Sequence, residues 1–325
     1  MTKSSVRIGG AGGFLGDSSL AAPQLLKGGR LDYMILDYLA EATMSSLGQL
    51  RAARPDQGYA RDFTDWVWKD NLREFKAQGV EVIGLRVDVS KVEEVQALAD
   101  AAIKTFGKVN LLFNNAGVGS GGLVWENTER DWDWVLGVNL HGVIHGVRIF
   151  TPLMLAEAKK DPSYEGHIVN TASMAGLLNA PAMGIYNVSK HAVVALTESL
   201  YQDLSLVTEQ IHCSVLCPYF VPTGITKSHR NRPEDLANTA PPTKSQLVAQ
   251  AMSDKAVSSG KVTAEQVGQM TFDAIRDAGF YIYSHPHALA PVQHRFEDIV
   301  SQRNPSDPFE GKPDVRARLV EALRD

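Results

Sequence analysis

The chain has 325 residues, 44% hydrophobic and 21% charged, a balance typical of a globular protein with a full core. Its net charge of −5 gives no reason to expect binding to nucleic acid or to an anionic membrane surface. No apolar run reaches the roughly 18–20 residues that a membrane span needs, and the length fits a single α/β domain.

The chain begins with a strand-like run, residues 6–8, and a glycine-rich turn that leads to a predicted helix. Gly10, Gly12 and Gly16 follow the spacing G-x-G-x-x-x-G. Glycines let the backbone approach a pyrophosphate, and a helix N-terminus offers free N–H groups to it. The turn is therefore a candidate dinucleotide site; the alternative is a flexible N-terminal chain.

A second strand is predicted over residues 31–37, and it ends in Asp37. Asp37 lies about 20 residues after Gly16, the spacing expected of an acidic residue that binds the ribose hydroxyls of a dinucleotide. In that role Asp37 would favour NAD over NADP. The alternative is a helix cap or an ordinary surface carboxylate.

From residue 79 onward, strand-type and helix-type segments alternate. Ser90 and Glu93 have the spacing of a capping box at the start of the first of these helices. The alternation predicts a doubly wound, Rossmann-like parallel sheet with helices on both faces and ligands at the carboxyl ends of the strands. Strands are expected over residues 80–87, 109–113, 167–171, 211–216 and 280–283, and helices over 90–106, 131–158, 184–204 and 263–277.

Two segments interrupt this alternation. Residues 224–262 contain several prolines and many polar residues, which favours a lid or a binding loop. Residues 301–325 form a polar tail that follows a single domain over 1–300. Cys213 and Cys217 share one strand and are expected to be buried thiols, which is typical of a reducing cytoplasm and of a cytoplasmic protein. The N-terminus has no uninterrupted apolar region, so a secretory signal is not expected.

Ser173, Tyr186 and Lys190 form the strongest chemical pattern. Tyr186 and Lys190 are four residues apart and lie on one face of a predicted helix. A cation beside a phenol favours the phenolate and shifts the phenol pKa towards neutral pH, which suits proton transfer. Ser173 ends an apolar strand and could direct its hydroxyl to the same place. A chance Y-x-x-x-K in an ordinary helix is the alternative.

Four further motifs surround this pattern in a fixed order. They are the run 114–117 (N-N-A-G), Asn139, the pair 217–218 (Cys-Pro), and Thr223. The complete set resembles the classical short-chain dehydrogenase/reductase family over about residues 79–300. The family usually has glycine after the proline of its Pro-Gly turn, and Tyr219 in this position could narrow the nicotinamide site or distort the turn.

The resemblance implies a role for each matching residue. Tyr186 is the general acid/base, Lys190 lowers its pKa and holds the nicotinamide ribose, Ser173 orients the substrate oxygen, and Asn139 belongs to a proton relay through water and Lys190. The cofactor-binding residues are expected to be Gly10, Gly12, Gly16, Asp37, Asp88, Val89, Asn115, Ala116, Gly117, Tyr186, Lys190, Pro218, Val221 and Thr223.

The implied activity is hydride transfer between NAD, or NADP, and a small-molecule secondary alcohol or ketone. An apolar substrate is expected from the hydrophobic residues around the motif. The family also implies a homodimer or homotetramer that associates through the helices over 131–158 and 184–204. His141 and His145 are four apart but have no third ligand nearby, so no metal is expected. The residues that suggest an apolar substrate are Met174, Leu177, Leu178, Met183 and Ile185.

The first 78 residues depart from this family and resemble the N-terminus of the acyclic terpene utilisation (AtuA-like) family. A junction between two families is expected near residue 79, from a natural fusion, a chimera or a gene-model artefact. The segment is too short for a second large core, so it is expected to add two strands to the same sheet. Two alternatives remain open: a non-catalytic or cofactor-impaired relative of the dehydrogenases, and a lyase or hydratase module.

Overall fold

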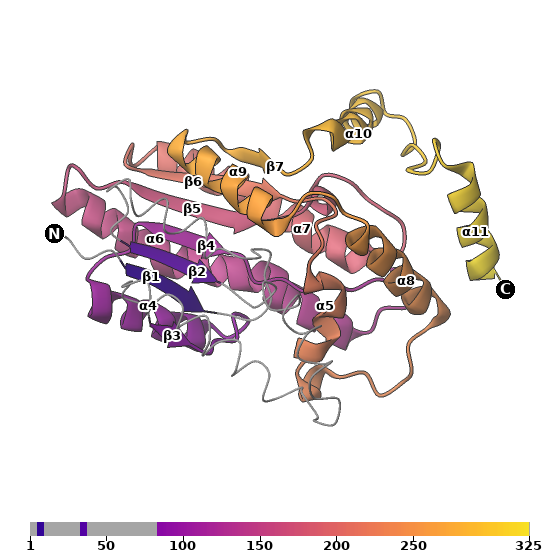
Figure 1. The fold of residues 1–325 in the computed structure, drawn as a ribbon, viewed down its shortest axis with the longest axis horizontal. Helices are drawn as coiled ribbons and strands as arrows, with labels where there is room; N and C mark the ends of the chain where they lie inside the picture. Colours follow the sequence, from indigo (N-terminus) through magenta and orange to yellow (C-terminus); the bar gives the residue numbers. More distant parts are fainter. Residues whose placement is uncertain (1–4, 10–32, 38–82, 325) are drawn as a thin grey trace.

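A computed structural model of the chain describes residues 5–9, 33–37 and 83–324 (Figure 1). These residues form a seven-stranded sheet in which every pair of neighbouring strands is parallel, in the order β3-β1-β2-β4-β5-β6-β7. The predicted doubly wound sheet is therefore confirmed. The strands are β1 (Ser5–Gly9), β2 (Tyr33–Asp37), β3 (Gly84–Leu85), β4 (Leu111–Asn114), β5 (Gly166–Thr171), β6 (Ile211–Cys217) and β7 (Tyr281–Tyr283).

The N-terminal segment contributes β1 and β2 to this sheet, as expected, but their positions are exchanged relative to the usual Rossmann order 3-2-1-4-5-6. β2 pairs with β4, and β1 lies between β2 and β3. Asp37 therefore ends the strand next to β4, and Gly9 ends the next strand outward, in register with Asp37. Gly10, Gly12 and Gly16 lie outside the described residues.

Helices cover both faces of the sheet. Leu112 of β4 belongs to a core cluster with α4 (Val92–Phe106), α6 (Gly142–Lys160) and α7 (Gly184–Ser205). Phe113 points to the opposite face, because strand side chains alternate. It meets Phe272 of α9 (Ala264–Arg276) edge to face, with ring centroids 6.0 Å apart.

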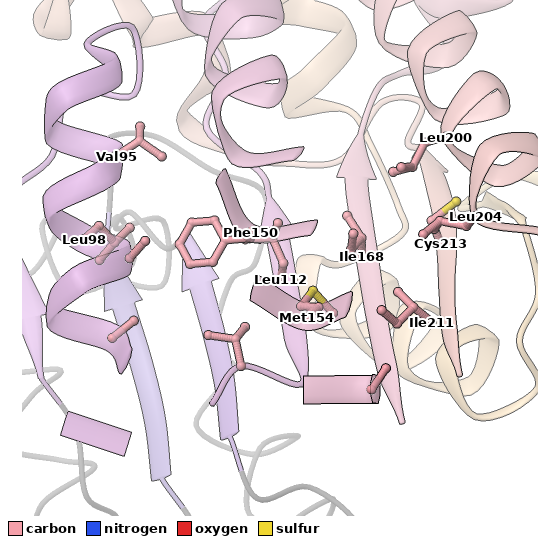
Figure 2. Close-up of a cluster of buried hydrophobic side chains, with 14 of the residues drawn as sticks. Val95, Leu98, Leu112, Phe150, Met154, Ile168, Leu200, Leu204, Ile211 and Cys213 are labelled. Carbon is pink, nitrogen blue, oxygen red and sulfur yellow. The ribbon is translucent and has the colours of Figure 1, made fainter. Parts of the chain in front are cut away.

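The larger core lies between the sheet and α4, α6 and α7 (Figure 2). Its strand residues come from alternate positions, so a single face of each strand is buried there. Each large apolar side chain that is fully buried stabilises the fold by about 1.5–3 kcal/mol. Cys213 belongs to this cluster, and it and Cys217 are buried free thiols, as expected. The labelled members are Val95, Leu98, Leu112, Phe150, Met154, Ile168, Leu200, Leu204, Ile211 and Cys213.

The segment expected to be a long loop is largely regular. It contains the 3₁₀ helices η3 (Gly224–Asn231) and η4 (Glu234–Leu236), followed by α8 (Lys244–Ser258). Thr243 caps α8 in a reciprocal box with Gln246, a signal that the proline content of the segment obscured. The helix α10 (Ala290–Val300) was not predicted. α11 (Pro313–Arg324) follows it and lies away from the sheet in Figure 1, whereas Val292 of α10 packs against the core cluster that includes Val215 of β6.

The start of α4 also differs from the prediction. The helix begins at Val92, and Ser90 does not cap it. The Asp88 carboxylate instead accepts hydrogen bonds from the Ser90 N–H (3.0 Å) and hydroxyl (2.7 Å). Glu94 accepts from the Asp88 N–H at 2.6 Å. The carboxylates thus stabilise the turn that precedes the helix.

The predicted helix over 131–158 is divided by a π-helical turn. α5 (Glu129–Leu136) is followed by η1 (Gly137–His141), in which the backbone takes the wider i→i+5 form, and then by α6. π-turns within helices are frequent at functional sites, and this one carries Asn139. Gly142 and Gly146 are required here for close packing: a Cβ on Gly142 would lie 2.7 Å from Val89 Cγ2, and one on Gly146 would lie 1.9 Å from Asn114 Oδ1.

Gly146→Ala is expected to destabilise the protein by about 1–3 kcal/mol, because α6 would have to move away from β4. Gly137→Ala is the matched control: its Cβ would lie 3.4 Å from Ser90 Cβ, an ordinary contact, and alanine favours the helix by up to about 1 kcal/mol. Urea unfolding midpoints measure both changes. Equal midpoints for the two variants would contradict the packing explanation.

Candidate active site

The site lies at the carboxyl ends of β4, β5 and β6, where the sequence places its polar motifs. Ser173 follows β5, and its Oγ accepts from the Ala175 N–H at 3.1 Å. The same hydroxyl donates to the carbonyl of Pro218, which follows β6, at 3.3 Å. Ser173 therefore links the ends of two neighbouring strands.

The helix α7 brings Tyr186 and Lys190 to this edge. Both are buried, at 6% and 2% exposure, and the Lys190 Nζ lies 5.8 Å from the centroid of the Tyr186 ring. The Lys190 ammonium donates to the Thr171 carbonyl at 2.9 Å, and the Ser173 hydroxyl lies close enough to Tyr186 to affect its pKa. The structure thus brings the three predicted residues together.

Burial controls the proton affinity of both groups. It raises the pKa of Tyr186 to about 12, although the hydrogen bond with Ser173 acts in the opposite direction. Burial also lowers the pKa of Lys190 to about 8, partly offset by the Cys217 thiol. Desolvation and Ser173 account for the shift of the Tyr186 pKa, and the expected lowering of that pKa by Lys190 stays a prediction. Tyr186 is therefore a protonated donor at neutral pH.

Asn139 is fully buried, and its side-chain amide joins two parts of the site. Its Oδ1 accepts from the Val118 N–H at 2.8 Å, and its Nδ2 donates to the Val118 carbonyl and to Ser189 Oγ, each at 3.0 Å. Ser189 in turn donates to the Tyr186 carbonyl at 2.8 Å. The amide therefore holds the segment after β4 against α7.

The run after β4 is close to both groups. A Cβ on Gly117 would come within 3.5 Å of Lys190 Nζ and 3.6 Å of Asn139 Oδ1. Asn115 Oδ1 accepts from the Thr171 hydroxyl at 2.8 Å, and Ala116 is buried beside it in the chain. This run therefore forms the wall of the site on the β4 side.

The residues assigned to the adenine are engaged within the protein. The Asp88 carboxylate holds the Ser90 turn, and the Val89 carbonyl lies 3.0 Å from His145 Nδ1. His145 and His141 have ring centroids 6.1 Å apart, and no group of three possible metal ligands is found among the described residues.

The segment after β6 offers a polar group to a cofactor. The Thr223 hydroxyl is buried and has no hydrogen-bond partner among the described residues. A buried hydroxyl of this kind fits the carboxamide of a nicotinamide, which both donates and accepts. Val221 is fully buried two residues earlier, and Pro218 is fixed through its carbonyl to Ser173 and to the Met174 N–H.

Tyr219, in place of the family's glycine, does not distort the turn. It has no positive φ, so the backbone there accepts a side chain. Its N–H donates to Ser284 Oγ at 3.0 Å, and its ring packs on Phe220 with centroids 4.2 Å apart. The ring also meets His285 edge to face.

Most of the apolar residues expected to surround a substrate belong to the core instead. Met174, the first residue of η2 (Met174–Gly176), and Leu177 belong to one buried core cluster, against which Leu178 packs. Ile185 packs with Trp134 in another. They do not show that the substrate is apolar. Met183, half-buried at the start of α7, is the exception.

Comparison with known proteins decides the family. Residues 65–234, just over half of the chain, match the family described as "short chain dehydrogenase". The chain belongs to the short-chain dehydrogenase/reductase family. Residues 6–107 match the "Acyclic terpene utilisation family protein AtuA", so both expected resemblances are confirmed and the two matches overlap.

Relatives of this short-chain dehydrogenase cover most of its length. A "CLA biosynthesis dehydrogenase/reductase" of Lactiplantibacillus plantarum is 30% identical over 257 residues, 78% of this chain and 85% of that protein. A "C alpha-dehydrogenase" of Sphingobium is 28% identical, over 78% and 79% of the two chains. A short-chain dehydrogenase of Burkholderia phymatum, solved with NAD, is 45% identical with a TM-score of 0.76, over 94% and 98%.

The chain is therefore an NAD(P)-dependent oxidoreductase that acts on small molecules. Among the described ranges, no helix is long and apolar enough to cross a membrane. Sequence reasoning missed Thr171 and Ser189, which fix Lys190 and Tyr186. Ser189 immediately precedes Lys190 in the motif, and this position was the available signal.

Proposed function

We propose that this dehydrogenase interconverts a secondary alcohol and its ketone, with Tyr186 as the general acid/base. The observation that carries the proposal is the buried phenol of Tyr186, with the Ser173 hydroxyl near enough to affect its pKa and Lys190 one helical turn away. Geometry of this kind, with a proton donor beside a hydroxyl that can orient an oxygen, suits reduction of a carbonyl.

The protein residues supply orientation and a proton, whereas NAD(P), when bound, supplies or accepts the hydride. In the reducing direction, the Ser173 hydroxyl directs the substrate oxygen towards Tyr186. The phenol of Tyr186 gives its proton to that oxygen, and the ammonium of Lys190 stabilises the phenolate that remains. Asn139 keeps α7 and the wall after β4 in place, which is a positioning role.

Among the described residues that would hold the cofactor, Pro218, Val221 and Thr223 follow β6, at the edge of the sheet where Tyr186 and Lys190 lie. Thr223 offers its buried hydroxyl to the nicotinamide carboxamide, with Val221 and Pro218 beside it. On the other side, Lys190 would hold the nicotinamide ribose. The remaining candidates are Gly10, Gly12, Gly16, Asp37, Asp88, Val89, Asn115, Ala116 and Gly117.

The test of this function is turnover by the full chain. Pairs of secondary alcohols and ketones that differ in polarity are assayed with NAD and NADP, and NADH or NADPH formation is followed by absorbance. Oxidation of apolar alcohols in preference to polar ones is the expected outcome, because the half-buried Met183 lies three residues before Tyr186. Failure to bind either cofactor at about 1 mM would support the cofactor-impaired alternative instead.

NAD is the proposed cofactor, because the 45% identical Burkholderia relative was solved with it. The wild type is expected to bind NAD at least about tenfold more tightly than NADP, a difference of about 1.4 kcal/mol. If Asp37 binds the ribose hydroxyls, Asp37→Ser should bring the two affinities together. Calorimetry measures the affinities of the wild type and the variant for NAD and for NADP. An unchanged ratio would mean that the exchange of β1 and β2 has removed Asp37 from the ribose.

We also propose a single catalytic domain over residues 1–300, followed by the polar tail over 301–325. In support, α11 contains no buried residue. The family's usual association into dimers or tetramers through α6 and α7 is proposed for this chain, and light scattering of the purified protein tests it.

A further inference from the structure

Residues 224–258, here called the substrate loop, lie directly against the segment that leaves β4. The Gly119 N–H donates to Ser228 Oγ at 3.0 Å, and the Leu123 N–H donates to Ser245 Oγ at 2.8 Å. Ser245 also donates to Glu126 at 2.6 Å. A Cβ on Gly121 would lie 2.6 Å from Ala249 Cβ, so α8 packs on the backbone of this glycine. The loop therefore packs directly against the segment after β4, which forms one wall of the site.

Asp131, in the first turn of α5, links the start of this helix to the substrate loop through both oxygens of its carboxylate. Oδ2 accepts from the N–H (2.9 Å) and the hydroxyl (3.0 Å) of Thr128, which caps the helix. Oδ1 accepts from Arg232 Nη1 at 2.6 Å and from Asn238 Nδ2 at 2.9 Å. Oδ2 thus completes the helix cap and also accepts a longer hydrogen bond from Gln246 of the loop, at 3.5 Å, whereas Oδ1 binds the loop alone.

This interaction is built inside the protein. Asp131 is 2% exposed and Arg232 14% exposed at the side chain. Burial would raise the pKa of Asp131, but the hydrogen bonds from Thr128, Arg232 and Asn238 together hold it below its ordinary value. Removal of one member of such a buried pair is costly, because it leaves the other charge without a partner.

Arg232 connects the pair to the catalytic helix. Its guanidinium lies over the ring of Trp134, 5.0 Å from the centroid. Trp134 belongs to a cluster with Val118 and Ile185, and Leu236 of the loop packs against it. Ile185 immediately precedes Tyr186, and Val118 is the residue that Asn139 holds. The loop, the β4 wall and the start of α7 therefore share one cluster.

We propose that Asp131 is a positioning residue whose Oδ1 holds the substrate loop closed through Arg232 and Asn238, and so shapes the substrate site beside Tyr186. The inference rests on the proposed function for its kinetic consequence only. The alternative is that Asp131 merely caps α5. The two differ in the variants they predict, because the cap uses Oδ2, whereas Oδ1 accepts from Arg232 and Asn238 of the loop and makes no cap hydrogen bond.

The experiment removes the hydrogen bonds from Arg232 and Asn238 to Asp131 and leaves the Thr128 cap of α5 intact. Arg232→Met retains packing on Trp134 but not the charge, and Asn238→Ala removes the second donor. Thr263→Ala is the matched control, since it deletes the capping box that Thr263 and Gln266 form with each other in α9, at a cost of about 1 kcal/mol. Each full-length variant is assayed for KM and kcat of the best alcohol, and for trypsin cleavage after Lys227 and Lys244. Arg232 precedes a proline and is not itself a cleavage site.

Arg232→Met is expected to raise KM at least about tenfold with kcat changed less than about threefold, and to speed cleavage within the loop at least about tenfold. The double variant Asp131→Asn with Arg232→Met should change KM and the rate of loop cleavage little more than either single variant does. The reason is that the two residues act as one pair. Unchanged KM and cleavage, or changes matched by Thr263→Ala, would overturn the proposal. The cleavage measurement decides it even if no alcohol is turned over.

Discussion

Tyr186→Phe should lower kcat by about 10²–10⁴-fold while the Kd for NAD changes less than about threefold. The phenol is the proton carrier in the proposed reaction, and phenylalanine retains the ring, which is buried at 6% exposure. Stopped-flow turnover and calorimetric NAD titration measure the two quantities separately. Turnover that survives in this variant would exclude Tyr186 as the acid/base and would favour a relay through another group.

Tyr164→Phe is the control for this change. Tyr164 is buried at 2% exposure, and its hydroxyl donates to the Val109 carbonyl just before β4. This contact lies at the amino ends of the strands, opposite the site. The same atom is removed from a similarly buried ring. A stability loss of about 1 kcal/mol with unchanged kcat is expected, because one buried hydrogen bond is lost away from the site.

The same chemistry fixes the direction of the pH dependence. Burial raises the pKa of Tyr186 to about 12, so the phenol is protonated across the neutral range. Carbonyl reduction uses this protonated form and should be insensitive to pH near neutrality. Alcohol oxidation requires the phenolate, and its kcat/KM should rise about tenfold for each pH unit from 7 towards the pKa of Tyr186 in the complex. A flat oxidation profile would contradict this assignment.

Lys190→Met should remove most turnover without destabilising the protein at neutral pH. The ammonium of Lys190 is buried and, among the described residues, donates to the Thr171 carbonyl alone, so its charge is costly to hold. Methionine has a similar length and carries no charge. A kcat loss of about 10²-fold or more with an equal or higher urea midpoint is the expected combination. A lower midpoint would mean that the ammonium contributes to stability.

The pH dependence of stability checks the same residue independently. The folded protein lowers the pKa of Lys190 to about 8 from its ordinary 10.5, so the neutral amine is favoured on folding. The wild type should therefore gain up to about 3 kcal/mol relative to Lys190→Met as the pH rises from 8 to 10.5. The buried thiols Cys213 and Cys217 titrate in the opposite sense; Cys213 cancels in the comparison, whereas Cys217 interacts with Lys190, so its contribution changes in the variant.

Local sequence spacing predicted the catalytic half of the site well. Tyr186 and Lys190 are one helical turn apart, and Ser173 follows a strand, so short-range geometry was sufficient to bring them together. Asn139 was found by its motif, but its contacts with Val118 depend on a π-helical turn that no composition signal indicates. The roles of Gly142 and Gly146 likewise depend on which strand lies behind the helix.

Long-range features could not be predicted in the same way. Asp131 and Arg232 are separated by 101 residues, and nothing in either segment indicates the other. The order of β1 and β2 is decided by competition among parallel pairings, which hydrophobic pattern alone does not resolve. Prolines in the substrate loop suggested irregular chain, whereas the capping residues Thr243 and Gln246 favoured the helix that is present.

The position of β1 and β2 decides what the N-terminal segment can be. β3 and β4 both come from the catalytic half of the chain, yet β1 and β2 separate them by pairing with one strand each. A protein without residues 1–78 would keep Ser173, Tyr186 and Lys190 but would have a gap of about two strand spacings, or ~10 Å, between the two-residue edge strand β3 and β4. Both sides of the gap would be open strand edges prone to aggregation. Any segment exchanged for residues 1–78, by recombination or by design, therefore has to supply two parallel strands that close the sheet.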